Sequence, residues 1–325
     1  MTPPFLINEA PNIIRLLSNP AGMADVVGDR AKGTILGLAA GNLLGLPVEG
    51  WSAAHIFRNF PNGVTQIDPL ERVRPMDDDL AQTVDLAESL VAGGNFVPDF
   101  GSRLVRWRRE NGRGIGITTS AVIDLLEKGF PPAEAASIVY EERDHIAPNG
   151  GLMRCAPVAL ARHSDPEGLV KDSAATCTVT HYAPACQWSC VIMNAAIYLL
   201  LKGRYPSIED LVMAAATDGA QADVVEWAMR TGEDLGDLEF DRGHIGHTLL
   251  CMQAGLWALK TPLDLENALV KIVSAGGDTD TNGAVAGAVL GARYGAAAIP
   301  DRWIECIPER ERLEDLALKL LNAAP

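Results

Sequence analysis

The sequence predicts an all-α protein, and three observations support this prediction. Of the 325 residues, 48% are hydrophobic but only 6% are aromatic, a composition that suits closely packed helices better than a β-sandwich. No segment shows the strong alternation of polar and apolar residues that is typical of half-buried strands. Two series of glycines with helical spacing indicate closely packed helices, which favours one large helical bundle.

The glycine series run from 33 to 45 and from 283 to 295, with a glycine at every fourth residue. Each series marks one face of a helix, and a face without side chains lets another backbone approach closely. Each glycine also lowers helix propensity by up to about 1 kcal/mol relative to alanine, so tertiary packing must hold both helices. We expect these two helices to form the inner floor of a functional site.

The rest of the chain indicates one main domain with an added arm. Residues 1–29 contain four prolines and are the predicted N-terminal extension, whereas residues 30–325 are the predicted main domain. The amphipathic segment 13–17 packs either on the core or on another subunit. The apolar run 190–201 is too short to cross a membrane and predicts a central core helix. Connections rich in glycine and proline are expected at 45–77, 93–101, 110–119, 130–132 and 145–151.

One acidic cluster opens a predicted amphipathic helix at 76–90. Asp77, Asp78 and Asp79 precede an apolar stripe with helical spacing. One or two acids at a helix start are explained by the helix dipole. Three consecutive acids repel one another, so either solvent screens them or a cation joins them.

A second acidic cluster opens the helix that carries the later glycine series. Asp278, Asp280 and Thr281 follow a Gly-Gly pair, which allows the tight turn that brings three oxygen ligands together. The alternative is that these residues only cap the helix. If the two acidic helix starts meet, five carboxylates share a small volume and require about two divalent ions. Because every ligand is an oxygen, we expect two Mg²⁺ or Mn²⁺ ions rather than zinc or copper.

Charge and cysteine content restrict the class of protein further. The formal net charge is −15 and the isoelectric point is near 4.8, which argues against a nucleic-acid-binding surface. The six cysteines lie mostly in apolar helical stretches without CxxC spacing, as expected for reduced core residues of a cytoplasmic protein. The N-terminus lacks the pattern of a secretory signal. No run reaches the roughly 18 uninterrupted apolar residues of a membrane helix, so no membrane association is expected.

Five motifs, read in chain order, resemble the ADP-ribosylglycohydrolase family over about residues 33–295. They are GTILGLAAGNLLGLPVEG at 33–50, DDDLAQTVDLAESL at 77–90, NGGLMRCAP at 149–157, THYAP at 180–184 and GHTLLCMQAGLWAL at 246–259, which precedes GGDTDT at 276–281. The resemblance implies a compact, single-domain, orthogonal helical bundle, in which 30–325 is the catalytic domain. It also implies that two metal ions hold the distal ribose of ADP-ribose while a metal-associated water attacks the anomeric carbon.

The residues and the resemblance together give three sets of candidate site residues. The predicted metal ligands are Asp77, Asp78, Asp79, Asp278, Asp280 and Thr281. The predicted catalytic residues are Glu49, Asp78 and Asp280. The predicted substrate-binding residues are Asn149, Gly150, Gly151, Met153, His181, Gly116 and His247. Glu49 is the candidate for activating water or protonating the leaving group, with a surface glutamate after a proline turn as the alternative.

Other roles near these residues stay open. The small residues 149–151 suit a pyrophosphate, and Arg154 either supports that anion or forms a structural ion pair. His181 alternatively caps a helix, and His247 alternatively packs in the core. Candidates for stacking on adenine are Tyr140, Tyr182 and Phe130.

The sequence departs from the family pattern at several positions. Asp77 and Leu80 stand where the family has the two threonines of its TDDT motif, although a register shifted by one residue aligns the aspartate pair with Asp77 and Asp78. Asn42 replaces the aspartate of the opening motif. Gly114 replaces the acid of the DIGxTT motif of arginine-specific members, which leaves the acceptor open.

The resulting hypothesis is a metal-dependent hydrolase that cleaves the glycosidic bond between ADP-ribose and a modified protein side chain, arginine or serine, or a related ADP-ribosyl conjugate. One alternative is a catalytically silent relative that binds ADP-ribose or serves structurally. Another is a glycosidase of a small nucleoside-like conjugate. The expected partner is an ADP-ribosylated protein or a small ADP-ribosyl conjugate, and the sequence does not specify an oligomeric state.

Overall fold

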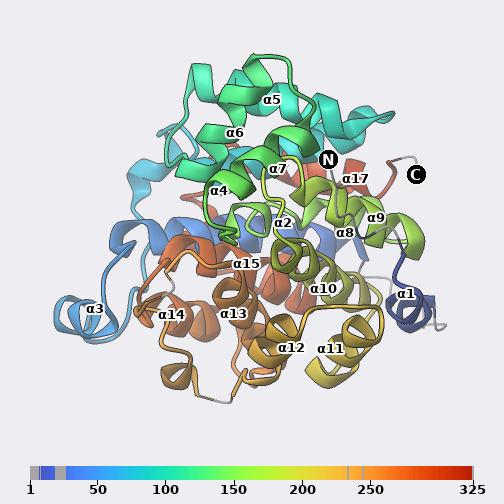
Figure 1. Ribbon diagram of the computed structural model, residues 1–325. Helices are drawn as coiled ribbons and strands as arrows, with labels where there is room; N and C mark the ends of the chain where they lie inside the picture. Colours follow the sequence, from blue (N-terminus) through green and yellow to red (C-terminus); the bar gives the residue numbers. More distant parts are fainter. Residues whose placement is uncertain (1–6, 8, 19–26, 233, 244, 324–325) are drawn as a thin grey trace.

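The computed structural model describes residues 7, 9–18, 27–232, 234–243 and 245–323 (Figure 1). These residues form helices and no β-strand, apart from two isolated bridges between Ser52 and Gly276 and between Pro148 and His247. The α-helices are α1 (Pro11–Ser18), α2 (Val27–Gly45), α3 (Ala53–Asn59), α4 (Asp78–Ala92), α5 (Phe96–Glu110), α6 (Ile117–Glu127), α7 (Pro132–Glu142), α8 (Pro157–Ala161), α9 (Pro166–Cys177), α10 (Pro184–Leu201), α11 (Ile208–Thr217), α12 (Ala222–Met229), α13 (Thr248–Lys260), α14 (Leu265–Ser274), α15 (Thr279–Tyr294), α16 (Asp301–Ile304) and α17 (Arg310–Leu320). The predicted all-α fold is confirmed.

Helices α2 and α15 form the centre of the molecule through their glycine faces. A Cβ atom added at Gly37 would lie 2.3 Å from the carbonyl oxygen of Gly287, and one added at Gly291 would lie 1.8 Å from that of Gly33. The two backbones are therefore in direct contact, and the two glycine series run past each other in opposite directions. Both helices lie side by side in the middle of Figure 1. The two helices that we expected to form the floor of the functional site, α2 and α15, are therefore one antiparallel pair.

Helices α4, α10, α13, α14 and α17 contact this pair directly, and further helices pack on them in two groups (Figure 1). Helices α4, α5, α6 and α7 lie above it in the view, whereas α10, α11, α12, α13 and α14 lie below and beside it. Helix α10 contains the apolar run 190–201, and nearly all its residues are buried, as the sequence predicts. The N-termini of α4 and α15 meet near the C-terminal end of α2, and this meeting point positions the candidate site.

By length and composition alone, two helical segments are long and apolar enough to cross a membrane. They are the segment Val27–Val48 and helix α10, and 83% and 94% of their most apolar windows are buried inside the protein. Other helices therefore cover this apolar surface. All six cysteines are free and buried, in agreement with their predicted place in the core.

The amphipathic segment of the predicted N-terminal extension packs on the core of its own chain. It forms helix α1, whose Asn12 and Ile13 backbone N–H groups both donate to the carboxylate of Asp218 at 2.9 Å. Residues 1–6, 8 and 19–26 of the predicted extension lie outside the described residues. The boundary at residues 29 and 30 therefore stays a prediction.

All five expected connections contain helical residues, which corrects the sequence analysis: α7 begins at Pro132, residues 149–151 form a 3₁₀ helix, and the other three contain more helix. Helix α3 lies inside 45–77, where Ser52 caps it by accepting from the backbone N–H of His55. Helices α5 and α6 begin at Phe96 and Ile117, inside 93–101 and 110–119. Pro98 does not prevent α5, because it stands in the first turn, where a backbone N–H has no helical acceptor.

Candidate metal centre and substrate cavities

The two acidic helix starts meet, and a tight glycine turn brings Glu49 to them. Gly276 and Gly277 have φ values of +82° and +78°. Their backbone is joined to the segment after α2, since Gly277 N donates to Trp51 O at 2.9 Å and Gly50 N donates to Gly277 O at 2.8 Å. A Cβ atom at Gly277 would lie 1.9 Å from the carbonyl oxygen of Phe240. Only glycine fits this turn, which holds Glu49 beside the start of α15.

The carboxylates form two groups that share one residue. In the first group, Glu49, Asp278 and Asp280 have carboxylate oxygens within 4.8 Å of one another. In the second group, the same limit holds for Asp77, Asp79 and Asp280. Asp280 therefore lies between two adjacent sets of oxygen ligands. This arrangement has the composition expected of a binuclear site for hard divalent cations.

Neighbouring polar side chains orient these carboxylates. Asn42 Nδ2 donates to Asp77 Oδ2 at 2.7 Å, and Thr281 Oγ1 donates to Asp79 Oδ2 at 3.3 Å. The second oxygen of each aspartate, Oδ1, is buried without a hydrogen-bond partner, as is Oδ1 of Asp280. Buried acceptors normally have partners, so three unpartnered oxygens in one small volume fit a bound cation.

Burial and mutual repulsion make the charged forms of these acids unfavourable when no cation is bound. Burial, and then the neighbouring Asp77, raise the pKa of Asp78 to about 8. Burial first, and then other carboxylates, raise the pKa values of Asp79 and Asp280 well above the usual range of aspartate. Glu49 is exposed as a residue, but its carboxylate lies among these acids, so partial loss of water and then Asp278 and Asp77 also raise its pKa. Among the described residues, no lysine or arginine forms an ion pair with any of these six acids, so a divalent cation is the fitting partner.

Two predicted metal ligands have positions that differ from those of the others. Asp78 belongs to neither carboxylate group, although it lines the cavities on both sides of the centre. Thr281 directs its hydroxyl at Asp79. Asp77 is 2% exposed, which contradicts the alternative that solvent screens its charge.

A cavity of about 310 Å³ opens on one side of the centre, and most of the predicted substrate-binding residues line it. Those residues are Gly116, Asn149, Gly150, Met153 and His181. Asn149 also donates its side-chain N–H to Asp278 Oδ2 at 2.8 Å, which joins this cavity to the metal centre. The small residues at 149–151 form a short 3₁₀ helix.

Gly151 and His247 do not line this cavity, so their predicted contact with substrate is corrected. A Cβ atom at Gly151 would lie 2.8 Å from Cys177 Sγ, because this glycine faces the interior. His247 is the N-cap of α13, and its Nδ1 accepts from the backbone N–H of Leu249 at 3.2 Å. Its ring also lies 5.9 Å from that of Trp227.

Arg154 and the three aromatic candidates for adenine stacking also lie elsewhere. Arg154 is fully buried and does not line the cavity, and it donates to Gln82 Oε1 and Thr180 Oγ1 instead of forming an ion pair. Tyr140, Tyr182 and Phe130 are absent from the cavity lining. The apolar lining comes from Pro148 and Met153 and from three exposed isoleucines, Ile117, Ile146 and Ile245. Arg143 is the basic residue that sequence reasoning missed, and no motif marked it.

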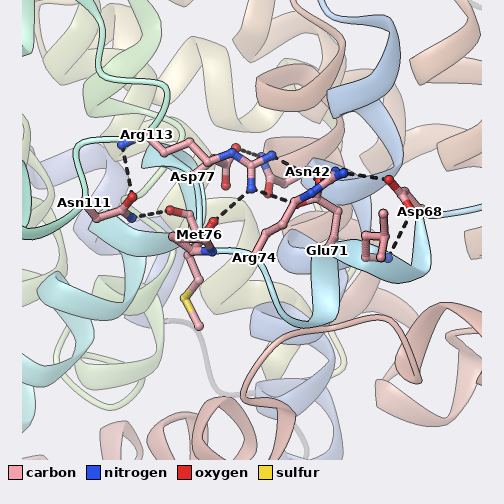
Figure 2. Close-up of polar contacts among 10 residues, drawn as sticks. Asn42, Asp68, Glu71, Arg74, Met76, Asp77, Asn111 and Arg113 are labelled. Atoms are coloured by element: carbon pink, nitrogen blue, oxygen red, sulfur yellow. Dashed lines mark hydrogen bonds and ion pairs between the residues drawn. The ribbon is translucent and has the colours of Figure 1, made fainter.

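A second cavity of about 460 Å³ opens on the other side of the centre. Both cavities are lined by Glu49, Asp78, Gly114 and Asp280. The second cavity also holds two arginines, which Figure 2 shows on either side of one glutamate. Arg113 Nη1 and Arg74 Nη1 lie 2.8 and 2.5 Å from the carboxylate of Glu71, and Arg74 Nη1 lies 3.1 Å from Asp68 Oδ2.

Gly114 is a glycine because Asp78 approaches it. Its φ is +78°, and a Cβ atom there would lie 2.5 Å from Asp78 Oδ1. An aspartate at this position, as in the family motif DIGxTT, would therefore require Asp78 to move.

Comparison with known proteins agrees with this geometry. The family model described as ADP-ribosylglycohydrolase matches residues 23–325. The chain belongs to the ADP-ribosylglycohydrolase family. The predicted enzyme class, a glycosidic-bond hydrolase of the ADP-ribosylglycohydrolase type, is thereby confirmed. The match begins inside the segment predicted as the N-terminal extension.

Similar proteins cover nearly the whole chain. An uncharacterized protein of Archaeoglobus fulgidus is 31% identical over 90% of this chain and 96% of its own length. The ADP-ribosyl-[dinitrogen reductase] glycohydrolase of Rhodospirillum rubrum is 29% identical over 86% of this chain and 90% of its own. The ADP-ribosylarginine hydrolase Tri1 of Serratia proteamaculans is 26% identical over 100% of this chain and 83% of its own. A solved structure titled as an ADP-ribosylglycohydrolase-related protein complex superposes with a TM-score of 0.76, at 29% identity, over 93% of this chain and 100% of that chain.

Proposed function

We propose that this protein is a hydrolase that depends on two Mg²⁺ or Mn²⁺ ions and releases ADP-ribose from a modified protein side chain or a related small conjugate. The observation that carries the proposal is the pair of carboxylate groups sharing Asp280, at the junction of two cavities. Two relatives are named for hydrolysis of ADP-ribosyl groups on arginine or on dinitrogen reductase. The expected partner is therefore an ADP-ribosylated protein or a small ADP-ribosyl conjugate.

The smaller cavity suits the nucleotide part of such a substrate. Asn149, Gly150 and His181 supply a polar wall near Asp278. The isoleucines at the rim offer apolar contact to the adenine, and Arg143 offers a positive charge to the pyrophosphate. The distal ribose then lies at the carboxylate centre, where both cavities meet.

The reaction breaks the bond between the anomeric carbon and the acceptor atom, while the oxygen of a water molecule bonds to that carbon. Bound divalent ions would lower the pKa of that water and fix the ribose hydroxyls. Glu49 is exposed at the junction of the cavities and has a raised pKa, so it is the residue suited to exchange a proton with water or the leaving group. The nearby carboxylates favour the positive charge that develops on the sugar.

The larger cavity favours an acceptor linked through a hydroxyl group, such as serine, over arginine. A guanidinium leaving group needs a carboxylate partner. Away from the metal centre the cavity offers Asp68 and Glu71, and both already pair with arginines. Gly114 supplies no further acid. A hydroxyl leaving group needs only a proton.

The test is release of ADP-ribose by the metal-loaded protein from serine-linked, arginine-linked and O-acetyl-linked substrates. We expect faster release from the serine-linked or acetyl-linked substrate, and we expect Arg74→Gln to raise the relative rate on the arginine-linked one, because it frees Asp68. Equal or faster release from arginine in the wild type would refute the acceptor preference alone. Tight ADP-ribose binding without any release would instead favour a catalytically silent relative.

A further inference from the structure

We propose that Arg154 and Thr180 are positioning residues that hold His181 as a neutral imidazole whose Nε2–H donates into the smaller cavity. The acceptor would be an oxygen of the nucleotide. This assignment of the acceptor rests on the proposed function, whereas the protonation of the ring does not.

Arg154 is an unusual residue for a protein core. Its side chain is fully buried, and it lies over the ring of Phe100 at 5.0 Å. It donates to Gln82 Oε1 and to Thr180 Oγ1, and within the described part of the chain it forms no ion pair with a carboxylate. Burying a guanidinium without a carboxylate is costly, so a role beyond packing is expected.

Only one assignment of donors and acceptors around Thr180 gives every buried polar hydrogen an acceptor. Arg154 can only donate, so it occupies a lone pair of Thr180 Oγ1. The same oxygen lies 2.7 Å from His181 Nδ1. If His181 donated from Nδ1, the hydroxyl hydrogen of Thr180 would be buried without an acceptor, since Thr180 is 1% exposed and its oxygen contacts these two side chains. The hydroxyl therefore donates to Nδ1, and the ring proton lies on Nε2.

The charge of Arg154 also keeps the ring neutral. Burial, and then this neighbouring positive charge, lower the pKa of His181 to about 3. The ring is therefore neutral at neutral pH. One of its nitrogens carries a proton and donates, and the other accepts.

The edge of the ring that carries Nε2 faces the cavity wall. A Cβ atom at Gly150 would lie 2.8 Å from Cε1 and 3.0 Å from Nε2 of His181. Any larger residue at 150 would therefore press on this edge, whereas glycine leaves room for His181, which is 3% exposed, to line the cavity. A neutral Nε2–H donor suits a phosphate or hydroxyl oxygen and rejects a ligand that presents a donor at that point.

The protonation state is tested on the ligand-free protein by NMR of ¹⁵N-histidine, with the signals of His181 assigned by their loss in His181→Ala. The expected result is a neutral ring with Nε2 protonated at neutral and mildly acidic pH. A ring protonated at Nδ1, or a charged ring, would overturn the proposal. Thr180→Val should shift His181 toward a mixture of neutral forms, whereas Thr180→Ser should keep the wild-type signals.

Ligand binding tests whether Thr180 acts through His181. Thr180→Val and His181→Ala should each weaken ADP-ribose binding about tenfold, the effect of losing one good hydrogen bond. The double variant should be no weaker than His181→Ala alone, and Thr180→Ser should bind within about twofold of the wild type. If the two losses of affinity instead add up in the double variant, Thr180 does not act through His181. A wild type that binds no ADP-ribose would refute the proposed function and leave the ring assignment to the NMR result.

Discussion

Asn42 and Asp77 each depart from the family pattern, and they contact each other. In the register that aligns Asp77 with the first threonine of the TDDT motif, the family pattern has an aspartate at the first position and a threonine at the second. Here the amide of Asn42 donates to the carboxylate of Asp77 at 2.7 Å. The pair therefore carries one carboxylate in this chain, as it does in the family pattern. The two departures therefore compensate for each other.

This compensation predicts a non-additive response to mutation. Asn42→Asp should lower the free energy of unfolding of the metal-free protein by about 1–3 kcal/mol, because it removes the donor and places a carboxylate against Asp77. Adding Asp77→Thr should recover most of that loss, because it restores a donor and removes a charge. Chemical denaturation of the wild type, both single variants and the double variant measures the coupling. Additive effects would show that the two positions are independent.

Glu49 allows a prediction about catalysis that is separate from folding. Glu49→Gln keeps the shape of the side chain but removes its ability to exchange a proton. We expect kcat to fall by about 10²–10⁴-fold, with little change in melting temperature because the side chain is exposed. Mn²⁺ titration of the same variant separates two roles, because Glu49 also belongs to one of the carboxylate groups. Lost activity with retained metal binding assigns Glu49 to proton transfer, whereas weakened metal binding assigns it to the metal centre. Nearly normal turnover would exclude that role.

At the scale of elements, the contact between α2 and α15 limits substitution of its glycines. Gly37→Ala should lower the free energy of unfolding by about 3 kcal/mol, near the upper end for overpacked cores, because the added Cβ would lie 2.3 Å from a backbone oxygen. Gly28→Ala in the same helix is the matched control. There the added Cβ would lie 3.6 Å from Leu318 Cδ2, an ordinary contact, so stability should stay unchanged or rise by up to about 1 kcal/mol. Equal denaturation midpoints for the two variants would refute a tight backbone contact.

Elements with a strong periodic signal were predictable from the sequence, whereas those formed by long-range packing were not. The spacing of the glycines predicted α2 and α15. The two runs of acids predicted that the N-termini of α4 and α15 meet at one site. Helix α5 was missed because a proline such as Pro98 normally indicates the end of a helix, and its place in the first turn of α5 is visible only in the structure. The roles of Arg143 and Arg154 depend on which distant side chains they meet, and no local pattern records that. Gly114 was recognised as a departure, but its cause, the approach of Asp78, required the structure.

At the scale of the whole molecule, the carboxylate centre joins segments from both ends of the chain. Glu49 follows α2, Asp79 lies in α4, and Asp280 lies in α15. Without a cation the buried acids oppose the packing of these helices, because each charge is removed from water without a positive partner. A cation that binds only the folded state would stabilise the whole bundle through this one point.

The last prediction concerns how metal and pH together control stability. An acid whose pKa is raised on folding stabilises the protein fully below its unfolded pKa, and that contribution is lost as pH rises through the folded pKa. For Asp78 this window runs from 3.8 to about 8, so the metal-free protein should become less stable between mildly acidic and mildly alkaline pH.

Bound Mn²⁺ should remove this loss, because it pairs with the deprotonated acids. At about 100 times the dissociation constant, the gain is about 2.7 kcal/mol. The rise in melting temperature caused by Mn²⁺ should therefore be larger at pH near 8 than near 6, where protons compete with the metal. Calorimetric melting with Mn²⁺ and with a chelator at both pH values measures it, and Asp280→Asn should abolish most of the difference, since Asp280 belongs to both ligand groups. Melting curves that are the same with metal and with chelator would contradict a metal centre at these residues.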